Sequence, residues 1–394
     1  MNLKKTIELY EKYVIPTYGK TPLQLARGKG TKVWDERGKA YLDFFPGWAV
    51  SGIGHCHPRV VKALKKQAGK LIHVSNNYYH EWQALLAEKI IKASFPGKVF
   101  FCNSGAEANE AAIKLARKFG NPERNEVITF EGSFHGRTLA TVTATGQKKH
   151  QKGFDPLPAG FVHVPFNDFA ALEKAISPKT VAIILEPIYG EGGIRVADKQ
   201  YLVALRKLCS QKNILLIFDE IQTGMGRTGK MFCYQNFGIE PDMFTLAKSL
   251  GGGFPVGALV AKKEIADTLG PGSHGTTFGG NPMACVAGLA TFEAIEKEKL
   301  IENAKTTGTY LLKKLNELKE KHSVIREVRG LSLMAGIELA VEGKKIYEDC
   351  LKSGLLINCT QGNVLRIMPP ITVTKKEIDT AVKILDEAFT RSAQ

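Results

Sequence analysis

The chain has 394 residues, of which 44% are hydrophobic and 24% are charged, as in ordinary globular proteins. This length exceeds what one simple core needs, so it predicts a large domain plus a smaller one. No apolar run is long enough to span a membrane, and the first residues lack the apolar core of a signal peptide. Seven scattered cysteines without a C-x-x-C motif predict reduced thiols in a cytoplasm.

The formal net charge is +15, which raises the question of nucleic-acid binding. The lysines are spread along predicted helices, for example at Lys313-Lys314, and no basic stripe is interleaved with aromatic residues. This pattern favours a solvated basic surface, without nucleic acid as a partner. A positively charged protein also attracts anionic substrates.

In the first hundred residues the sequence predicts one hairpin, with short helices before and after it in the chain. The hairpin turns at Asp35–Gly38, and a Gly-rich apolar stretch follows at 44–58. This stretch ends in His55-Cys56-His57, which resembles a metal cluster, but adjacent side chains rarely reach one ion and no second ligand pair stands at zinc-finger spacing. A structural turn without metal is therefore predicted. The apolar periodicity predicts helices at 6–13, 59–68 and 81–93.

A first candidate for ligand binding lies where a buried strand, 99–102, turns into a helix at 106–118. The turn Asn103-Ser104-Gly105-Ala106-Glu107 offers a hydroxyl and unpaired N–H groups at a helix N-terminus, where anions bind readily. A plain N-cap explains the same residues equally well. Taken alone, the turn leaves both interpretations open.

Polar residues follow two of the next predicted strands. After 127–129 comes Ser133-Phe134-His135-Gly136-Arg137-Thr138, in which Arg137 can hold a carboxylate through two hydrogen bonds, although a surface arginine is the simpler alternative. After 181–185 come Glu186 and Glu191. A strand at 161–165 and helices at 169–176 and 201–212 are also predicted.

The strand at 214–218 is apolar without alternation, which predicts burial on both faces of a parallel sheet. It ends at Asp219, and open α/β sheets bind ligands at the carboxyl ends of such strands. A second apolar stretch, 243–247, ends at Lys248, with three glycines two residues beyond. A lysine in that position can be desolvated and become a nucleophile toward carbonyls. A buried salt bridge between Asp219 and Lys248 is the simpler alternative.

The segment 224–229 spells G-x-G-x-x-G, the pattern of dinucleotide-binding turns. That motif should follow its strand directly and open a helix. Here residues 219–223 intervene, and the residues that follow have no helical period. The sequence therefore predicts an active-site loop in place of a nicotinamide site.

The last third of the chain shifts to Lys- and Glu-rich helices near Lys299, which predicts a domain boundary. Arg366 alternates with apolar neighbours, so it points to one face of a strand. Thr374–Glu377 has the pattern of a capping box that opens the last helix. The other predicted elements are strands at 256–261, 324–328 and 331–340, a strand pair at 355–359 and 364–368, and helices at 283–296, 301–321 and 346–353.

Together these motifs resemble the class III, or ω-amino, pyridoxal-phosphate aminotransferases of fold type I over essentially the whole chain. The similar motifs are N-S-G-A-E, F-H-G-R-T, E-P-I-x-G-E, D-E-x-Q-T-G-x-G-R-T-G, A-K-S-L-G and H-G-T-T-F-G-G-N-P. The resemblance implies an α/β fold, with a mainly parallel central sheet in a large domain and a small α+β domain. The implied division assigns 56–298 to the large cofactor-binding domain, and 1–55 and 299–394 to the small one.

The resemblance implies pyridoxal 5′-phosphate as the cofactor and no metal. Catalysis would rest on Lys248, which forms a Schiff base with the cofactor and moves protons, and on Asp219, which keeps the pyridine ring protonated. The implied cofactor contacts are Ser104, Gly105, Ala106, Phe134, Asp219, Gln222, Lys248 and Thr277. The implied substrate contacts are Arg137, Thr276, Glu191 and Arg366.

For the substrates, the resemblance implies that Arg137 holds the α-carboxylate of the donor and that Arg366 grips the α-carboxylate of 2-oxoglutarate or glutamate. Glu191 would pair with Arg366 and switch it off for one of the two substrates. The loop with Thr276 and Thr277 would be shared across the interface of a homodimer.

The implied reaction is a ping-pong transfer of a terminal amino group to 2-oxoglutarate, which leaves as glutamate. Ornithine-specific members carry a tyrosine where this chain has Gly47, which favours an acylated donor such as N2-acetylornithine, as in arginine biosynthesis. N-succinyl-diaminopimelate, ornithine and 4-aminobutyrate are alternative donors, and a less favoured alternative is an aminomutase, which would not need Arg366. Pro46, Trp48, Ser51 and Tyr189 are unusual around the pocket, and Tyr189, where the family pattern has glutamine, predicts a changed pocket wall or substrate choice.

Overall fold

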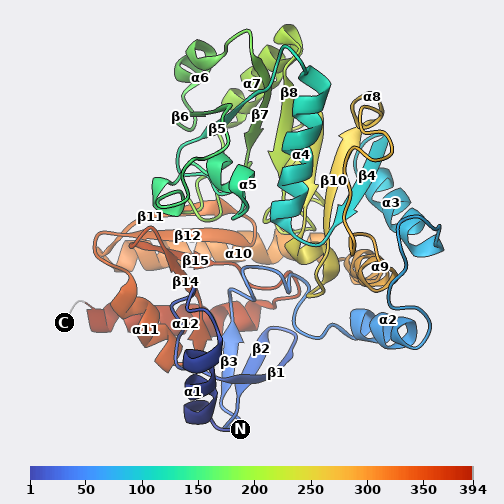
Figure 1. Cartoon of the computed structure of the whole chain (residues 1–394). Coiled ribbons are helices and arrows are strands. Elements are labelled where there is room, and N and C mark those ends of the chain that lie inside the picture. The colour runs from blue at the N-terminus through green and yellow to red at the C-terminus, as the bar shows by residue number, and fades with distance from the viewer. Residues whose placement is uncertain (393–394) are drawn as a thin grey trace.

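A computed structural model describes residues 1–392 of the chain, and these residues form three β-sheets. Figure 1 shows the largest sheet in the upper half of the molecule and the two smaller sheets below it. The first and last parts of the chain, blue and red, lie together in the lower half. The predicted division at 55/56 and 298/299 falls just before α2 and between α9 and α10; it remains a prediction.

The large sheet has seven strands in the order β4-β10-β9-β8-β7-β5-β6, and five of them run parallel to one another. The strands β7, β8 and β9 are buried at every residue, as their unbroken apolar runs predict. The bounds are β4 Gly97–Cys102, β5 Glu126–Phe130, β6 Phe161–Val164, β7 Thr180–Leu185, β8 Leu215–Asp219, β9 Met243–Leu246 and β10 Gly257–Lys262.

Helices cover this sheet and connect its strands. The helix α9 is the most deeply buried of them and packs against α2, α3 and the short 3-10 helix Lys248–Gly251. The bounds are α2 Pro58–Ala68, α3 Glu81–Ala93, α4 Gly105–Gly120, α5 Leu139–Ala144, α6 Phe169–Ala175, α7 Lys199–Lys212, α8 Lys263–Ala266 and α9 Pro282–Lys297. Two further 3-10 turns span Lys148–His150 and Cys233–Asn236.

The two smaller sheets join distant parts of the chain. One has the order β1-β2-β3-β13, in which β13 pairs with β3 in parallel, and the other has the order β11-β12-β15-β14. The bounds are β1 Leu25–Lys29, β2 Lys32–Asp35, β3 Ala40–Asp43, β11 Ile325–Leu331, β12 Met334–Leu339, β13 Leu355–Leu356, β14 Asn358–Thr360 and β15 Val364–Ile367.

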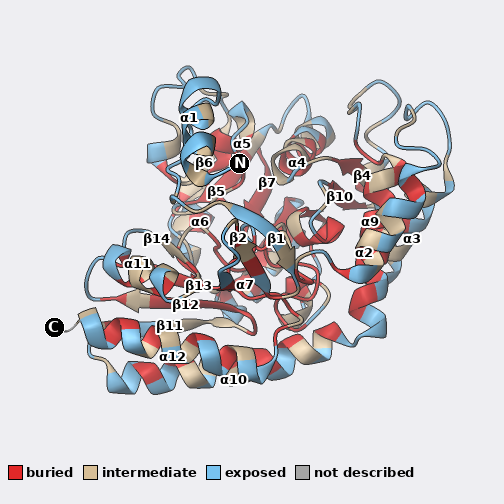
Figure 2. Ribbon diagram, turned by 90° about the horizontal axis from the view of Figure 1, so that it is seen from below, coloured by how far each residue is buried: buried red, intermediate tan, exposed pale blue. Residues whose placement is uncertain are grey.

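Four helices accompany these sheets: α1 Leu3–Tyr13, α10 Leu300–Lys321, α11 Lys344–Lys352 and α12 Lys375–Ser392. In Figure 2, α10 and α12 lie side by side with buried stripes inward and exposed stripes outward, as amphipathic helices should. The predicted capping box is confirmed, because the backbone N–H of Glu377 donates to Thr374 Oγ1 and that of Thr374 donates to Glu377 Oε2. Within residues 1–392 no helix is both long and apolar enough to cross a membrane.

One predicted strand differs in the structure, and one helix in it was not predicted. The single strand predicted at 355–359 is divided, because β13 joins β3 while β14 joins β15 in another sheet. The helix α5 was not predicted, since its threonines and valine favour a strand and only a capping box at Thr138 marks its start.

The histidines at 55 and 57 serve two separate contacts. His55 Nε2 lies 2.8 Å from Asp43 Oδ2, and His57 Nε2 lies 3.2 Å from Glu298 Oε2. Cys56, between them, is exposed. The two imidazoles therefore tie this turn to two different elements.

Candidate active site

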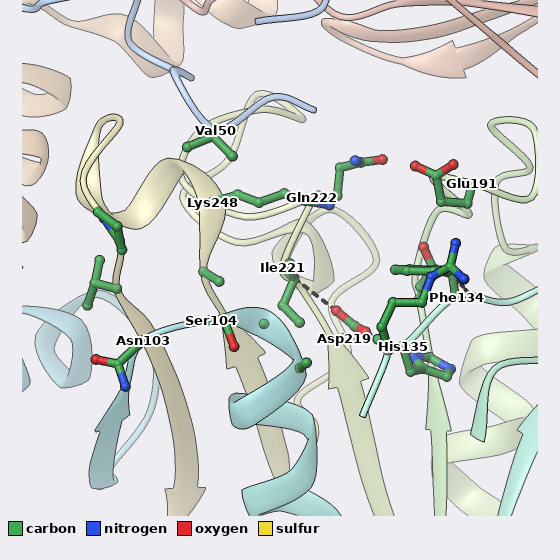
Figure 3. A pocket seen from close by; sticks show the side chains of 18 of the residues that line it. Val50, Asn103, Ser104, Phe134, His135, Glu191, Asp219, Ile221, Gln222 and Lys248 are labelled. Atoms are coloured by element: carbon green, nitrogen blue, oxygen red, sulfur yellow. Dashed lines mark hydrogen bonds and ion pairs between the residues drawn. The ribbon is translucent and has the colours of Figure 1, made fainter. Parts of the chain in front are cut away.

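A cavity of about 430 Å³ lies beyond the carboxyl ends of the central strands, where a parallel sheet binds ligands. Figure 3 shows side chains from widely separated segments around it. Many of the residues predicted for the site line it, namely Ser104, Gly105, Ala106, Phe134, Arg137, Glu191, Asp219, Gln222 and Lys248.

Asp219 ends β8 and is held in one orientation by a buried network. Its Oδ2 atom lies 2.9 Å from His135 Nδ1 and accepts a hydrogen bond of 2.8 Å from Asn109 Nδ2. Asn109 in turn accepts from Thr245 Oγ1 at 2.8 Å. The carboxylate therefore has fixed partners on one side and can face a ligand on the other.

The partners of Asp219 received no role from the sequence. His135 stands in the quoted F-H-G-R-T motif, but neither its neighbours nor its spacing reveal a contact with Asp219. Asn109 lies in the Ala-rich helix α4 and is completely buried. A polar residue on an otherwise apolar helix face was the signal that could have found it.

Lys248 follows β9 and begins a short 3-10 helix with a positive φ of 45°. Burial lowers the pKa of its amine below the usual value, and the carboxylates of Glu191 and Asp219 oppose that shift. Among residues 1–392 the predicted alternative, a salt bridge between Asp219 and Lys248, does not form, since the ion-pair partner of Asp219 is His135. The lysine thus keeps an amine suited to attack a carbonyl.

The N-terminus of α4 lies at the cavity. Ser104 is the N-cap, and its hydroxyl accepts from the N–H of Glu107 at 3.2 Å. The first N–H groups of a helix lack partners within the helix, and they attract anions such as phosphate. A Cβ at Gly105 would meet Ile221 at 2.8 Å, so glycine allows the helix start to pack against the loop after β8.

Glu186 is a fully buried carboxyl that received no role from the sequence. Its two oxygens accept from the backbone N–H groups of Phe134 and Gly190, each at 2.9 Å. Burial, with the neighbouring Asp219 carboxylate, raises the pKa of Glu186 to about 7. Glu186 therefore fixes both the segment that carries Phe134 and the loop that carries Glu191.

Arg366 lies beside the cavity and reaches it through Glu191. Its Nη1 donates to Glu191 Oε1 at 2.9 Å, and its Nε donates to Asn358 Oδ1 at 2.7 Å. The guanidinium also lies 4.5 Å from the centre of the Phe45 ring. Arg137, in contrast, is exposed and lies 5.5 Å from the Phe134 ring.

The structure places Thr276 and Thr277 outside this cavity. Both line a neighbouring cavity of about 340 Å³, together with Asn103 and Glu107. Thr276 Oγ1 accepts from Asn103 Nδ2 at 3.1 Å. Within one chain these threonines therefore lie next to the main cavity but do not line it.

Tyr189 also does not reach the cavity, contrary to the pocket-wall interpretation. Its ring stacks on Phe166 at 4.1 Å between centroids, and its hydroxyl donates to the carbonyl of Glu131 at 3.2 Å. Gly47 and Ser51 are likewise absent from the lining of the cavity in one chain, whereas Val50 belongs to it.

The G-x-G-x-x-G segment forms a loop between sheets. Arg227 within it is fully buried and donates to the carbonyls of Leu333, at 3.1 Å, and of Pro369. Burial lowers the pKa of this arginine to about 10. The motif thus ties the loop after β8 to the sheet that carries Arg366, and it opens no helix.

The residues of the cavity fit pyridoxal 5′-phosphate. A helix N-terminus can receive the phosphate, Phe134 can stack on the ring, and Asp219 can hold a protonated ring nitrogen. The Oε1 atom of Gln222 is buried without a hydrogen-bond partner among residues 1–392, so it can accept from the ring hydroxyl. Lys248 supplies the amine that this cofactor requires.

Comparisons with known proteins agree with this geometry. The family model "Aminotransferase class-III" matches residues 13–389. Acetylornithine aminotransferases of Methanocaldococcus jannaschii and Caldanaerobacter subterraneus are 54% and 51% identical, over 99% and 96% of this chain and 99% and 98% of theirs.

Solved structures share the fold at lower sequence identity. An ornithine aminotransferase of Toxoplasma gondii ME49 has a TM-score of 0.96 and 32% identity, with 100% of this chain and 96% of that chain covered. An acetylornithine aminotransferase of Elizabethkingia anophelis has a TM-score of 0.89 and 34% identity, with 99% and 100% covered. The chain therefore belongs to the class III aminotransferases.

Proposed function

We propose that this enzyme transfers the terminal amino group of N2-acetylornithine to 2-oxoglutarate, giving N-acetylglutamate 5-semialdehyde and glutamate, with pyridoxal 5′-phosphate as cofactor. The observation that carries the proposal is the shared cavity of Lys248, Asp219 and Glu191, with Arg366 bound to Glu191 at its edge. The names of the similar acetylornithine aminotransferases support the choice of donor.

When bound, pyridoxal phosphate supplies an aldehyde that condenses with amines and a ring that accepts electrons. The α4 N-terminus with Ser104 would hold the phosphate, and Phe134 would pack on the ring. Asp219, oriented by His135 and Asn109, would accept a hydrogen bond from the protonated ring nitrogen and keep that nitrogen protonated. Gln222 would orient the ring hydroxyl through its unpaired Oε1 atom.

Lys248 would hold and move protons at its Nζ atom. Burial lowers the pKa of this amine, so a larger share of it is unprotonated at neutral pH. An unprotonated amine can take the proton from the substrate carbon that bears nitrogen and return it elsewhere. The same amine can also attack a carbonyl carbon.

Two arginines would recognise substrate carboxylates. Arg137, exposed at the mouth of the cavity, would bind the α-carboxylate of the donor, with Thr276 close by. Arg366 would bind the α-carboxylate of 2-oxoglutarate or glutamate. During the donor step, Glu191 would neutralise Arg366, as their 2.9 Å contact allows.

We further propose a homodimer that shares the loop of Thr276 and Thr277 across its interface. These threonines lie next to the cavity of their own chain without lining it, which fits a contribution to a second chain's cavity. A cytoplasmic location agrees with the seven free cysteines. The reaction would serve arginine biosynthesis.

The test is a panel of half-reactions with purified enzyme loaded with pyridoxal phosphate, without an acceptor. N2-acetylornithine, ornithine, 4-aminobutyrate and N-succinyl-diaminopimelate are each mixed with the enzyme, and the absorption of the cofactor is followed. The proposal expects the fastest conversion with N2-acetylornithine. Faster conversion with ornithine, as the Toxoplasma structure's name suggests for that protein, would contradict the donor assignment and keep the aminotransferase chemistry.

A further inference from the structure

We propose that Asn358 is a positioning residue, which holds the guanidinium of Arg366 ready for the α-carboxylate of 2-oxoglutarate or glutamate without neutralising the charge of the guanidinium. The proposal rests on the proposed function and concerns its acceptor half-reaction alone. Its basis is the arrangement of β14 beside β15, which brings an amide and a guanidinium together at the edge of the cavity.

The register of these strands sets the contact. Asn358 and Arg366 are direct cross-strand partners, so their side chains lie on the same face of the sheet. Asn358 Oδ1 accepts from Arg366 Nε at 2.7 Å, and the Phe45 ring lies 4.5 Å from the guanidinium carbon. The amide and the ring thus fix the orientation of the guanidinium and leave its terminal nitrogens for carboxylates.

The charge of the site explains why an amide suits this position. The side chain of Arg366 is 1% exposed, and its ion-pair partner among residues 1–392 is Glu191, whose side chain is 25% exposed. An asparagine accepts a hydrogen bond without carrying charge, so Arg366 needs a carboxylate from elsewhere. Glu191 supplies it in the structure, and a substrate carboxylate can replace Glu191.

The backbone near Glu191 is fixed from the same side. Thr360 Oγ1 and Gln361 Nε2 donate to the Glu191 carbonyl at 2.9 and 2.8 Å, and Arg329 Nε donates to the Gly193 carbonyl at 2.9 Å. Exchange of carboxylates at Arg366 therefore requires rotation of the Glu191 side chain and no movement of its backbone. The strand β14 and the residue after it anchor both members of the pair.

The experiment compares the two half-reactions of the N358A holoenzyme with those of the wild type. Glutamate should need a concentration about 10-fold higher for half-maximal rate, because a hydrogen bond to a charged group is lost. The concentration of N2-acetylornithine needed for half-maximal rate should change by less than about twofold, because Glu191 still neutralises Arg366 in that step.

A matched control is N363A in the turn between β14 and β15. Asn363 Nδ2 donates to the carbonyl of Leu339 at 3.0 Å, and in the described part of the chain its side chain forms no hydrogen bond with Arg366. N363A should retain wild-type behaviour in both half-reactions. An equal rise with N363A and N358A, or an equal loss in both half-reactions of N358A, would overturn the proposal.

The isosteric variant N358D separates charge from packing, and it carries the test if N358A does not fold. It keeps the acceptor atom and adds a permanent carboxylate, so glutamate binding should weaken more than in N358A. Wild-type behaviour of N358D would overturn the proposal. A wild-type enzyme that converts glutamate but not N2-acetylornithine would contradict the proposed donor and leave the Asn358 comparison readable with another ω-amine.

Discussion

The two ends of the cavity are built in different ways. At the cofactor end, Asp219 and Lys248 lie at the ends of neighbouring strands of one sheet, and the partners of Asp219, His135 and Asn109, are buried. At the carboxylate end, Arg366 belongs to a second sheet and meets Glu191 from a loop after β7. The cofactor end is therefore built on one sheet, whereas the carboxylate end is a contact between a second sheet and a loop.

This difference follows from what each end must do. A cofactor stays, so rigid partners prepared in advance are an advantage. In the proposed reaction two different substrates use the carboxylate end in turn, so the contact between Glu191 and Arg366 would have to open and close. A neutral amide beside Arg366 and a partly exposed Glu191 suit that exchange.

The largest effect is expected at the cofactor end from Lys248→Ala. Turnover should fall by at least about 10³-fold, because the group that moves protons is lost. The absorption typical of the loaded enzyme should also disappear. Lys230→Ala, which changes an exposed lysine in the neighbouring loop, is the control. Normal transamination by Lys248→Ala would refute the assigned chemistry.

The next largest effect is expected from Asp219→Asn. The rates of both half-reactions should fall roughly 10²-fold, because a neutral amide cannot stabilise a protonated ring nitrogen. The half-reactions of both substrates should slow to the same extent, which distinguishes the cofactor end from the carboxylate end. The control is Asp242→Asn, since Asp242 binds Arg206 at 2.7 Å and lies away from the cavity. A loss restricted to glutamate would contradict the division into two ends.

At the carboxylate end, Glu191→Gln should change selectivity more than rate. Arg366 would lose its carboxylate during the donor step, so the preference for N2-acetylornithine over glutamate should fall about 10-fold. Separate half-reactions measure this ratio. Glu327→Gln, which alters an exposed partner of Arg329, should keep the wild-type ratio.

Glu186 gives a pH test of the segment that joins both ends. Its pKa is raised from 4.5 to about 7, so the folded protein binds this proton more tightly than the unfolded chain does. Ionisation of Glu186 therefore lowers the free energy of unfolding as the pH rises from about 4.5 to about 7, by at most about 1 kcal/mol per pH unit.

Glu186→Gln should make this pH dependence shallower in urea titrations at several pH values. The substitution should not abolish the pH dependence, because burial also raises the pKa of Glu220 to about 7. The exposed Glu8→Gln variant serves as the reference. An unchanged slope in Glu186→Gln would mean that the carboxyl ionises normally in the folded protein.

The smallest effect is expected from Tyr189→Phe. The variant loses one hydrogen bond to the Glu131 carbonyl and keeps the stacking on Phe166, so unfolding should become easier by about 1 kcal/mol. Kinetics of both half-reactions should stay as in the wild type. A changed preference for the amino donor would support the interpretation that Tyr189 belongs to the wall of the pocket.

The sequence predicted the large sheet well because its strands carry strong, local signals. Unbroken apolar runs that end in Asp219 or Lys248 locate both a buried strand and its functional edge. The motif of Ser104 was equally local, since an N-cap and the helix after it lie within a few residues. The resemblance added the expected roles of these residues, which local patterns alone leave open.

Contacts between segments that are far apart in the chain could not be predicted from the sequence. Nothing local says that Leu355 joins β3 whereas Asn358 joins β15, because both follow the same apolar pattern. The contacts of Asp219 with His135 and Asn109 depend on the packing of α4 against the sheet. The orientation of Tyr189 likewise depends on Phe166, which its own neighbours do not indicate.

The parallel pairing of β13 with β3 has a consequence for synthesis of the chain. Strand β3 leaves the ribosome early, but its partner Leu355–Leu356 follows only after more than three hundred further residues. Until then, one edge of the first sheet offers unpaired backbone groups to any passing strand. All seven strands of the large sheet are therefore synthesised before β13, and we expect the edge at β3 to stay unpaired until the last part of the chain emerges.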